Sequence, residues 1–387
     1  MVTQPLRIVQ VINVRWFNAT AWYGLTLSRL LRDAGHEVLV LALPETEPFV
    51  RARMLGFEPV PLNINTAHPV PLAGALRRLN CLLRTFRPHI VNCHRGEGML
   101  FWGMGKSLGH DFVLVRTRGD QRPPKANIVN RRLHACCVDA VIATNTDTAR
   151  QCRRLLKVPE DRLYVIVGGV DTDLFSHNED DRVEVRAALG FASNDTVVGL
   201  VGRFDAVKGQ RELMEAFALV RDFREKQMIG QRGRLRLMLV GFPATLSEDA
   251  IQARIKEYGL EDCTVTTGRV GRVSAYINAM DLGVVASQGS EAIARAALEI
   301  MSCGVPLMGT YVGVMPDLLP PWALVSPGDS SALSNLLRQA ASDVSFRARL
   351  REAARIRMAT LSESAFLEQS MQVYVTALQR RFARYPL

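Results

Sequence analysis

Two cationic side chains follow a short apolar run in the second half of the chain. The segment VVGLVGRFDAVKG predicts a β-strand that ends at Gly202, and the loop after it carries Arg203 and Lys208. Arginine offers a planar fork of donors and lysine a mobile point charge, so the pair suits a diphosphate at the carboxyl end of a parallel strand. The alternative is that both are ordinary loop cations paired with Asp205 or Glu212. The residues alone leave both interpretations open.

Two carboxylates and one guanidinium lie in the alanine-rich segment SEAIARAALEIMSCGVP, residues 290–306. The pattern predicts a helix that begins at Ser290 or Glu291 and stops at the glycine and proline of CGVP. On such a helix Glu291, Arg295 and Glu299 would stand four residues apart. One interpretation is therefore a surface ladder of ion pairs, each worth about 0.3–0.5 kcal/mol.

The neighbours of these charged residues argue against a surface helix. They are almost all apolar: Ala292, Ile293, Ala294, Ala296, Ala297, Leu298, Ile300 and Met301. A surface helix would carry several more polar side chains. We therefore expect a helix that is buried nearly all round, with N-terminal amides at 292–294 that attract an anion. Arg295 is then expected to pair with one of the two glutamates and hold it in place.

In the first half of the chain, polar side chains follow two predicted strands. The segment RPHIVNCH ends at His94, and a lone histidine is more often structural than functional. A dense cluster follows the next strand, in VRTRGDQRPPK: Arg116, Arg118, Asp120, Arg122 and Lys125. The cluster is either a solvated loop or a recognition loop, because loops at the carboxyl ends of strands often carry function. Its charges would suit a phosphate-bearing substrate.

The elements that must position these residues alternate between strands and helices. Strands are expected at residues 7–12, 37–41, 90–92, 112–116, 140–143, 163–167, 197–201, 236–240, 264–266, 282–285, 306–308 and 323–325. This alternation predicts an α/β fold with parallel sheets and helices on both faces. The two series predict two doubly wound, Rossmann-like domains that face each other across a cleft. Ligands in such sheets collect at the carboxyl ends of the strands.

The domain boundaries follow from where the chain becomes polar. We expect an N-terminal Rossmann-like domain over residues 1–172 and a second one over 173–362. Residues 363–387 are expected to form a C-terminal helix that packs back on the first domain.

The composition narrows the class of partner. The chain has 387 residues and a formal net charge of +10, which favours anionic partners. Its seven cysteines are scattered and form no CxxC pair, which is typical of a reduced, cytoplasmic protein.

The N-terminus reads as a first strand, not a signal peptide, and no apolar run approaches the ~20 residues of a spanning helix. The basic amphipathic segment 71–88 is either a peripheral membrane contact or, as we favour, an ordinary sheet-packing helix.

Several motifs together resemble a known family. They are Arg203-x4-Lys208-Gly209, Glu291-x7-Glu299 followed by CGVP, and GTYVGVMPDLL at 309–319. In this order and spacing they are similar to the C-terminal half of the retaining GT-B glycosyltransferases of family 4, the group 1 glycosyl transferases. GHEVLVLALP, RPHIVNCH and VGGVDTDLF lie where the family has its own versions, so the resemblance covers nearly the whole chain.

The resemblance implies roles for individual residues. The two cations would hold the diphosphate of a nucleotide-diphosphate sugar, most simply a UDP- or GDP-sugar, in the second domain. Glu291 would contact the donor sugar, and Glu299 the ribose. Further donor-binding residues implied by the family are Gly202, Val270, Ala292, Ile293 and Ala294. His94 matches the second histidine of the family's H-x-H element, which contacts the donor sugar or steadies its leaving group, and Asn92 replaces the first.

Two departures from the family pattern stand out. The family usually has E-G-F-G where this chain has Glu291-Ala292-Ile293-Ala294, so the glycines' backbone freedom is lost. The family's glycine pair after the first strand is also missing, since VRWFNATAWYG has no glycine before Gly24.

The resulting interpretation is a retaining, metal-independent glycosyltransferase of the hexosyltransferase type without a cofactor. The acceptor-side residues would be Arg116, Arg118, Asp120 and Lys125, with a lipopolysaccharide core or another envelope glycolipid as acceptor. The expected place is the cytoplasm, at the inner face of the cytoplasmic membrane.

Two other functions stay open. One is a nucleotide-sugar 2-epimerase of the same architecture, which works without an acceptor. The other is a non-enzymatic protein that binds anions or nucleic acid. Nucleic acid is not expected as a partner, because the cations lack interleaved aromatic side chains.

Overall fold

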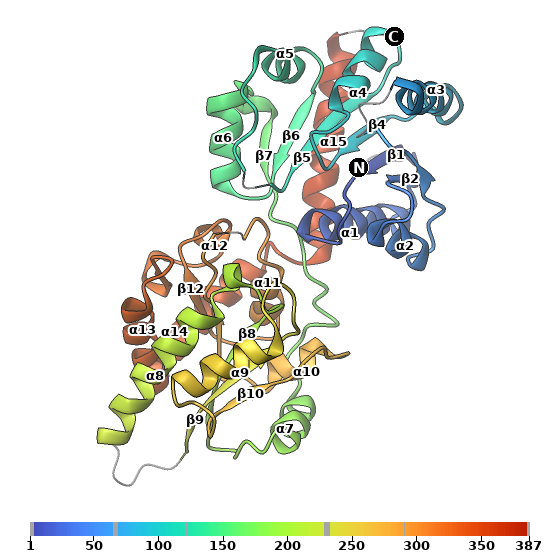
Figure 1. Cartoon of the computed structure of the whole chain (residues 1–387). Coiled ribbons are helices and arrows are strands. Elements are labelled where there is room, and N and C mark those ends of the chain that lie inside the picture. Colours follow the sequence, from blue (N-terminus) through green and yellow to red (C-terminus); the bar gives the residue numbers. More distant parts are fainter. Residues whose placement is uncertain (1–3, 65–68, 121, 228–232, 290, 385–387) are drawn as a thin grey trace. The chain divides into compact units, whose positions relative to one another are not determined.

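A computed structural model describes residues 4–64, 69–120, 122–227, 233–289 and 291–384 (Figure 1). The chain divides into two compact units. Unit 1 comprises Met1–Gly168 together with Glu363–Leu387, and unit 2 comprises Gly169–Ser362. Each unit is an α/β structure built on a parallel sheet.

The sheet of unit 1 has seven strands in the order β3-β2-β1-β4-β5-β6-β7. The strands are β1 (Arg7–Ile12), β2 (Glu37–Ala42), β3 (Val60–Pro61), β4 (Ile90–Cys93), β5 (Val113–Arg118), β6 (Ala140–Ala143) and β7 (Leu163–Val165). Every neighbouring pair is parallel. Strands β4, β5 and β6 are buried along their whole length because helices cover both faces. The strand order reverses between β1 and β4, and in such sheets ligands bind at the carboxyl ends near this reversal.

The helices of unit 1 are α1 (Ala19–Asp33), α2 (Glu47–Met54), α3 (Pro69–Phe86), α4 (Met99–Ser107), α5 (Ile128–Cys136), α6 (Thr146–Leu156) and α15 (Glu363–Arg384), with a 3₁₀ turn η1 (Glu160–Arg162). Asparagine side chains cap α1, α5 and α6, which fixes where these helices begin. The long helix α15 packs against α1, β5 and β6 (Figure 1). Its Phe366 stacks edge-on against Tyr23 of α1, with ring centroids 4.6 Å apart.

Helix α3 is amphipathic in the way the sequence predicts. Its Ala75, Leu79 and Leu83 are buried in the core of unit 1, whereas Arg77 and Arg78 are exposed. These contacts are those of a sheet-packing helix. No helix within the described ranges is long and apolar enough to cross a membrane.

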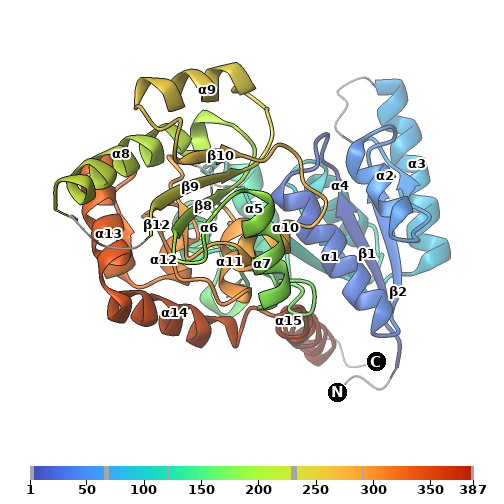
Figure 2. The same ribbon diagram turned by 90° about the horizontal axis from the view of Figure 1, so that it is seen from below.

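The sheet of unit 2 has six parallel strands in the order β10-β9-β8-β11-β12-β13. The strands are β8 (Thr196–Val201), β9 (Leu235–Val240), β10 (Thr264–Thr266), β11 (Leu282–Val285), β12 (Leu307–Thr310) and β13 (Leu324–Val325). The helices are α7 (Glu179–Ala188), α8 (Gln210–Gln227), α9 (Glu248–Glu257), α10 (Val273–Asn278), α11 (Arg295–Ser302), α12 (Met315–Leu318), α13 (Ser330–Ser342) and α14 (Val344–Met358), with 3₁₀ turns η2 (Ala206–Lys208) and η3 (Pro321–Ala323). Helix α13 packs against α8, and α14 against α11 (Figure 2).

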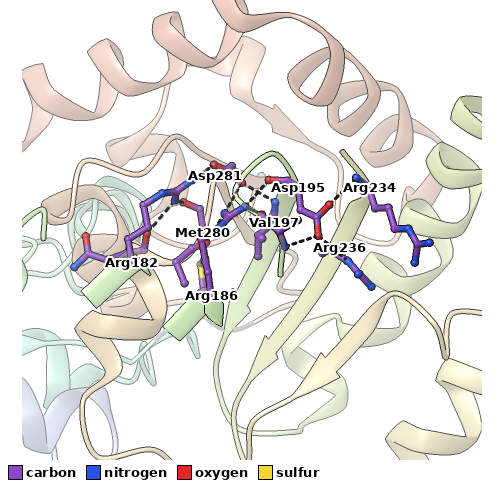
Figure 3. A network of polar contacts seen from close by, with 11 residues as sticks. Arg182, Arg186, Asp195, Val197, Arg234, Arg236, Met280 and Asp281 are labelled. Atoms are coloured by element: carbon purple, nitrogen blue, oxygen red, sulfur yellow. Dashed lines mark hydrogen bonds and ion pairs between the residues drawn. The ribbon is translucent and has the colours of Figure 1, made fainter. Parts of the chain in front are cut away.

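A polar network ties α7 to the amino ends of the strands of unit 2 (Figure 3). Asp281, just before β11, accepts hydrogen bonds from Arg182 at 2.6 Å and from Arg186 at 3.1 Å. Asp195, just before β8, accepts one at 3.1 Å from Arg236 of β9. The network therefore holds three strands in register at the edge opposite to their carboxyl ends. Its role is structural, because the buried charges satisfy one another.

Candidate active site

The loop after β8 is held against the end of β11. Asp205 caps η2 by accepting from the Val207 amide at 3.2 Å, and its carboxylate also lies 3.1 Å from Nη2 of Arg203. Gly209 ends η2 with a φ of +73°, and a Cβ there would lie 1.9 Å from the carbonyl oxygen of Ala286. Only glycine fits this position, so the loop approaches β11 this closely because residue 209 has no side chain.

Lys208 and Glu291 meet at this point. Lys208 Nζ lies 2.5 Å from Glu291 Oε1, and Ser287 Oγ donates to the same oxygen at 2.5 Å. Glu291 is only 6% exposed. The hydroxyl of Thr310, at the end of β12, donates to the Ser287 carbonyl at 2.5 Å. The carboxyl ends of β8, β11 and β12 thus converge on a carboxylate and an ammonium group. Lys208, Glu291 and Ala294 also line a small hollow beside β8 and β11.

The expected helix start at Ser290 or Glu291 is wrong. Ser290 lies outside the described residues, and Glu291 is in a loop, because α11 begins only at Arg295. Ala294 has a left-handed conformation with a φ of +49°, which stops the helix from extending toward Glu291. The Glu291 carbonyl instead accepts from the Val314 amide at 2.8 Å.

This difference has two further consequences. The three-residue ladder does not form, since Glu291 is outside the helix that carries Arg295 and Glu299. The amides at 292–294 are also not the amino end of a helix, so the helix-terminus argument for an anion site no longer holds, and donor binding by these residues stays a prediction. The proposal that this loop binds the donor now depends on its neighbours Lys208 and Ser287.

Arg295 pairs with one glutamate, as the sequence predicts. Its Nε donates to Glu299 Oε1 at 2.7 Å, one turn further along α11. Glu299 is 4% exposed, and burial raises its pKa above the usual range, while Arg295 acts in the opposite direction. The ion pair therefore keeps a carboxylate in place in a mostly apolar setting.

The remaining donor-side residues are spread over the same unit. Gly202 and Val270 are half-buried in the loops after β8 and β10, and Ala292 is half-buried next to Glu291. Ile293 is fully buried. The described residues of the chain contain no group of acidic, histidine or cysteine side chains that could hold a metal ion.

His94 lies directly after β4 in unit 1 and is 1% exposed. Its Nε2–H donates to Gln10 Oε1 at 2.7 Å, and its Nδ1 has no hydrogen-bond partner among the described residues. The Nδ1 atom is therefore the free acceptor of a neutral imidazole. Burial lowers the pKa of His94 to about 3, with a smaller contribution from Arg116, so the ring stays uncharged at neutral pH.

The partners of His94 reach the C-terminal helix. Gln10 Nε2 and Asn92 Nδ2 both donate to the hydroxyl of Tyr374 on α15, at 3.2 Å and 2.9 Å. The Asn92 carbonyl oxygen in turn accepts from Thr117 at 2.9 Å. This buried polar network holds Gln10 Oε1 toward His94 and so fixes which ring nitrogen carries the proton. Sequence reasoning missed Gln10 and Tyr374, because a single polar residue in an apolar strand or helix gives no sign of its partner.

The acceptor-side candidates lie at the end of β5. Arg116 and Arg118 are buried, whereas Lys125 is exposed. Asp120 turns the loop by accepting from the Arg122 amide at 3.0 Å.

Sequence reasoning also missed Ser287 in unit 2. The polar run SQGSE, which follows a buried strand directly, could have signalled it.

Two family models match the chain. Glycosyltransferase Family 4 matches residues 21–174, and Glycosyl transferases group 1 matches residues 181–357. A D-inositol 3-phosphate glycosyltransferase of Xylanimonas cellulosilytica is 26% identical over 278 residues, which make up 69% of this chain and 64% of that protein. The chain thus spans less than two thirds of the length of the first curated relatives it matches.

Solved structures share the fold. A glycosyltransferase from Rickettsia africae has a TM-score of 0.84 at 15% identity, with 97% of this chain and 99% of that one covered. Anabaena HepE in complex with UDP and glucose has a TM-score of 0.77 at 17% identity, with 96% and 100% covered. Together with the two parallel sheets, these similarities define a GT-B fold, which confirms the predicted fold class. Because the two family models cover most of the chain, it belongs to the group 1, family 4 glycosyltransferases.

Proposed function

We propose that the chain is a retaining glycosyltransferase that moves a hexosyl group from a nucleotide-diphosphate sugar to an acceptor. The observation that carries this proposal is the contact between Lys208 and Glu291 beside Arg203, at the carboxyl end of β8. The matched family and the UDP and glucose bound to HepE support a nucleotide-sugar donor, and the curated relative's name supports glycosyl transfer. UDP- and GDP-sugars are the first candidates.

The cations would act on the leaving group. In the proposed reaction, the bond between the sugar's anomeric carbon and the diphosphate breaks, and negative charge grows on the departing diphosphate. Arg203 has a side chain that is 56% exposed and Lys208 one that is 25% exposed, so both are available to a ligand. Charged donors that the protein holds near the diphosphate stabilise such a transition state.

The two glutamates would hold the rest of the donor. Glu291 orients the sugar hydroxyls, and Glu299 accepts hydrogen bonds from the ribose. His94 contributes its free Nδ1 as an acceptor for a sugar hydroxyl. The acceptor hydroxyl attacks from the face that the diphosphate leaves, which retains the anomeric configuration. Two cations at the diphosphate do the work of a divalent metal, so we expect EDTA to leave activity unchanged.

The acceptor would bind to unit 1 through Arg116, Arg118, Asp120 and Lys125. A lipopolysaccharide core or another envelope glycolipid would fit the excess of positive charge, with the enzyme working in the cytoplasm at the inner face of the cytoplasmic membrane. A 2-epimerase would convert its nucleotide sugar without any acceptor. Donor turnover that requires a glycan or glycolipid therefore distinguishes the two functions.

A thermal-shift screen of UDP, GDP and their sugars tests the donor site. We expect one of the two nucleotides to raise the Tm of the wild type, because a ligand that binds only the folded state stabilises it. Lys208→Ala and Glu299→Ala should bind that nucleotide more weakly while they stay folded. Lys256→Ala, an exposed lysine on α9, is the matched control and should respond as the wild type does. Unchanged nucleotide affinity in both site variants would overturn the assignment.

A further inference from the structure

Two guanidinium groups at the end of β5 are buried and form no ion pair with a described carboxylate. Arg116 is 5% exposed and Arg118 is 8% exposed. Neither forms an ion pair with any acidic residue in the described ranges. The nearby acids have other partners, since Glu97 pairs with Arg95 at 2.5 Å and Asp120 with Arg122 at 3.4 Å.

Neutral carbonyl groups are the partners of both guanidiniums. Arg116 Nη1 donates to the Cys93 carbonyl at 2.9 Å and also to the Thr117 carbonyl. Arg118 Nη2 donates to the Arg122 carbonyl, whereas its buried Nε has no acceptor among the residues that the structure describes. Carbonyls hold the side chains in position, and the only carboxylates that act on them electrostatically within the described ranges, Glu97 on Arg116 and Asp120 on Arg118, do so without forming an ion pair. A buried charge of this kind is costly unless an ion of opposite sign pairs with it.

The two side chains share one face of the sheet. They are two residues apart in β5, and alternate residues of a strand point to the same side. Their effect reaches His134 on α5, whose pKa is lowered to about 4, first by burial and then by Arg116 and Arg118. This end of the sheet therefore has a positive potential, which Glu97 and Asp120 offset only in part because each of them is paired with another arginine.

Gly96 lies beside the guanidinium of Arg116. In the loop after β4, Gly96 has no side chain, and a Cβ at that position would lie 3.9 Å from Arg116 Nη2. A larger side chain there would cover the guanidinium.

We infer that Arg116 and Arg118 bind a phosphate group carried by the acceptor. A phosphate monoester is close to a dianion at neutral pH, so two guanidiniums match its charge better than they match a carboxylate. The inference rests on the proposed function, in which the donor diphosphate belongs to Arg203 and Lys208 of unit 2. It adds the chemical class of the acceptor, and makes Arg116 and Arg118 the residues that select it.

Inorganic phosphate is the probe that tests this site. Its binding is measured by thermal shift at constant ionic strength, against chloride, with the full chain saturated with UDP. The same titration is repeated in Lys208→Ala, which lacks one cation of the proposed donor site. If UDP does not bind, this variant still separates phosphate bound near Arg118 from phosphate bound at the donor site. We expect a saturable rise in Tm that Arg118→Gln weakens at least tenfold. Arg132→Gln, an exposed arginine on α5, is the control and should behave as the wild type does.

Two further comparisons keep the test specific. Gly96→Val should weaken phosphate binding without removing a charge, and acetate should compete poorly. Competition by glucose 6-phosphate or by vesicles containing phosphatidic acid distinguishes a phosphosugar from a phospholipid acceptor, and competition by neither counts against the inference. Absence of saturable phosphate binding, an unchanged response in Arg118→Gln, or equal competition by acetate would overturn it. If neither UDP nor GDP binds, the proposed donor site is overturned, whereas the phosphate titration in Arg118→Gln still tests the arginine site separately.

Discussion

Lys208 Nζ lies 2.5 Å from Glu291 Oε1, although 83 residues separate the two in the chain. The contact joins the loop after β8 to the loop before α11. It also means that the cation proposed for the diphosphate is already neutralised by the acid proposed for the sugar. Donor binding must therefore divide the lysine between the carboxylate and the phosphate.

Glu291→Gln should separate nucleotide binding from turnover. The amide keeps the size of the side chain but releases Lys208, so UDP should bind as tightly as to the wild type or more tightly. Turnover should fall by about 10²–10³, the usual loss when one preorganised polar contact to a transition state is removed. Calorimetric titration with UDP and steady-state kcat measure the two effects. Glu257→Gln, an exposed acid on α9, is the control. A parallel loss of UDP affinity and turnover would contradict this division of roles.

Arg295→Gln should shift the pH dependence of donor binding. Burial raises the pKa of Glu299, and Arg295 opposes that rise, so the variant should have a still higher pKa at this carboxyl group. If the ionised form binds the ribose, affinity for UDP falls as pH drops through that pKa. The acid limb of a plot of affinity against pH should therefore move to higher pH in the variant. Arg254→Gln, on the surface of α9, should leave the limb in place.

The same carboxyl group affects stability with the opposite sign to that of an ordinary surface acid. A raised pKa in the folded state means that protonation favours folding. The stabilisation is fully present below the pKa of the unfolded chain, and it is lost as pH rises through the folded value. Glu299→Gln should remove this part of the pH dependence of Tm, and an unchanged dependence would contradict the burial effect.

Sequence patterns predicted the sheets well and the site only in part. Continuous apolar runs marked nearly every strand, because buried parallel strands are apolar on both faces. The two-residue strand β3 was too short to give such a pattern. The predicted helix start at residue 290 was wrong because contacts from distant parts of the chain override the local preference. Alanine-rich sequence favours helix, but the left-handed Ala294 and the bond from the Val314 amide are tertiary effects without a local signal.

The pairing of side chains was the least predictable property. Arg295 with Glu299 follows from the four-residue spacing, whereas Lys208 with Glu291 depends on how β8 and β11 lie side by side. Asp205 was one of two partners considered for the loop cations, and it does contact Arg203. The link from His94 to Tyr374 needs a helix 280 positions further along the chain, which no spacing rule reaches.

Gly209→Ala should be strongly destabilising. The left-handed backbone disfavours any side chain, and a Cβ would overlap the Ala286 carbonyl at 1.9 Å. We expect a loss on the order of 2–4 kcal/mol, seen as a drop in Tm of several degrees, because the loop must move away from β11. Gly271→Ala is the matched control, since no atom of another described residue, apart from its chain neighbours, lies within 4 Å of the added carbon there. Equal Tm values for the two variants would show that the loop can move away from β11 without a loss of stability.

Tyr374→Phe should weaken both the fold of unit 1 and the positioning of His94. The variant removes a hydroxyl that accepts from Gln10 and Asn92, and it leaves two buried amide donors without a partner, at a cost of about 1–3 kcal/mol. Tyr164→Phe is the control, because its hydroxyl donates to the exposed carbonyl of Asp161 and its loss should be close to neutral. A stability effect alone would leave the role of His94 open, so the second readout is ¹⁵N NMR of its imidazole. In the wild type, the spectrum should show a neutral ring protonated on Nε2 from pH 5 to 8, since its pKa is lowered to about 3. In the variant, Gln10 is free to turn, and both neutral tautomers should appear. A wild-type ring that titrates in this range, or a variant with the same single tautomer, would contradict the positioning role of Tyr374.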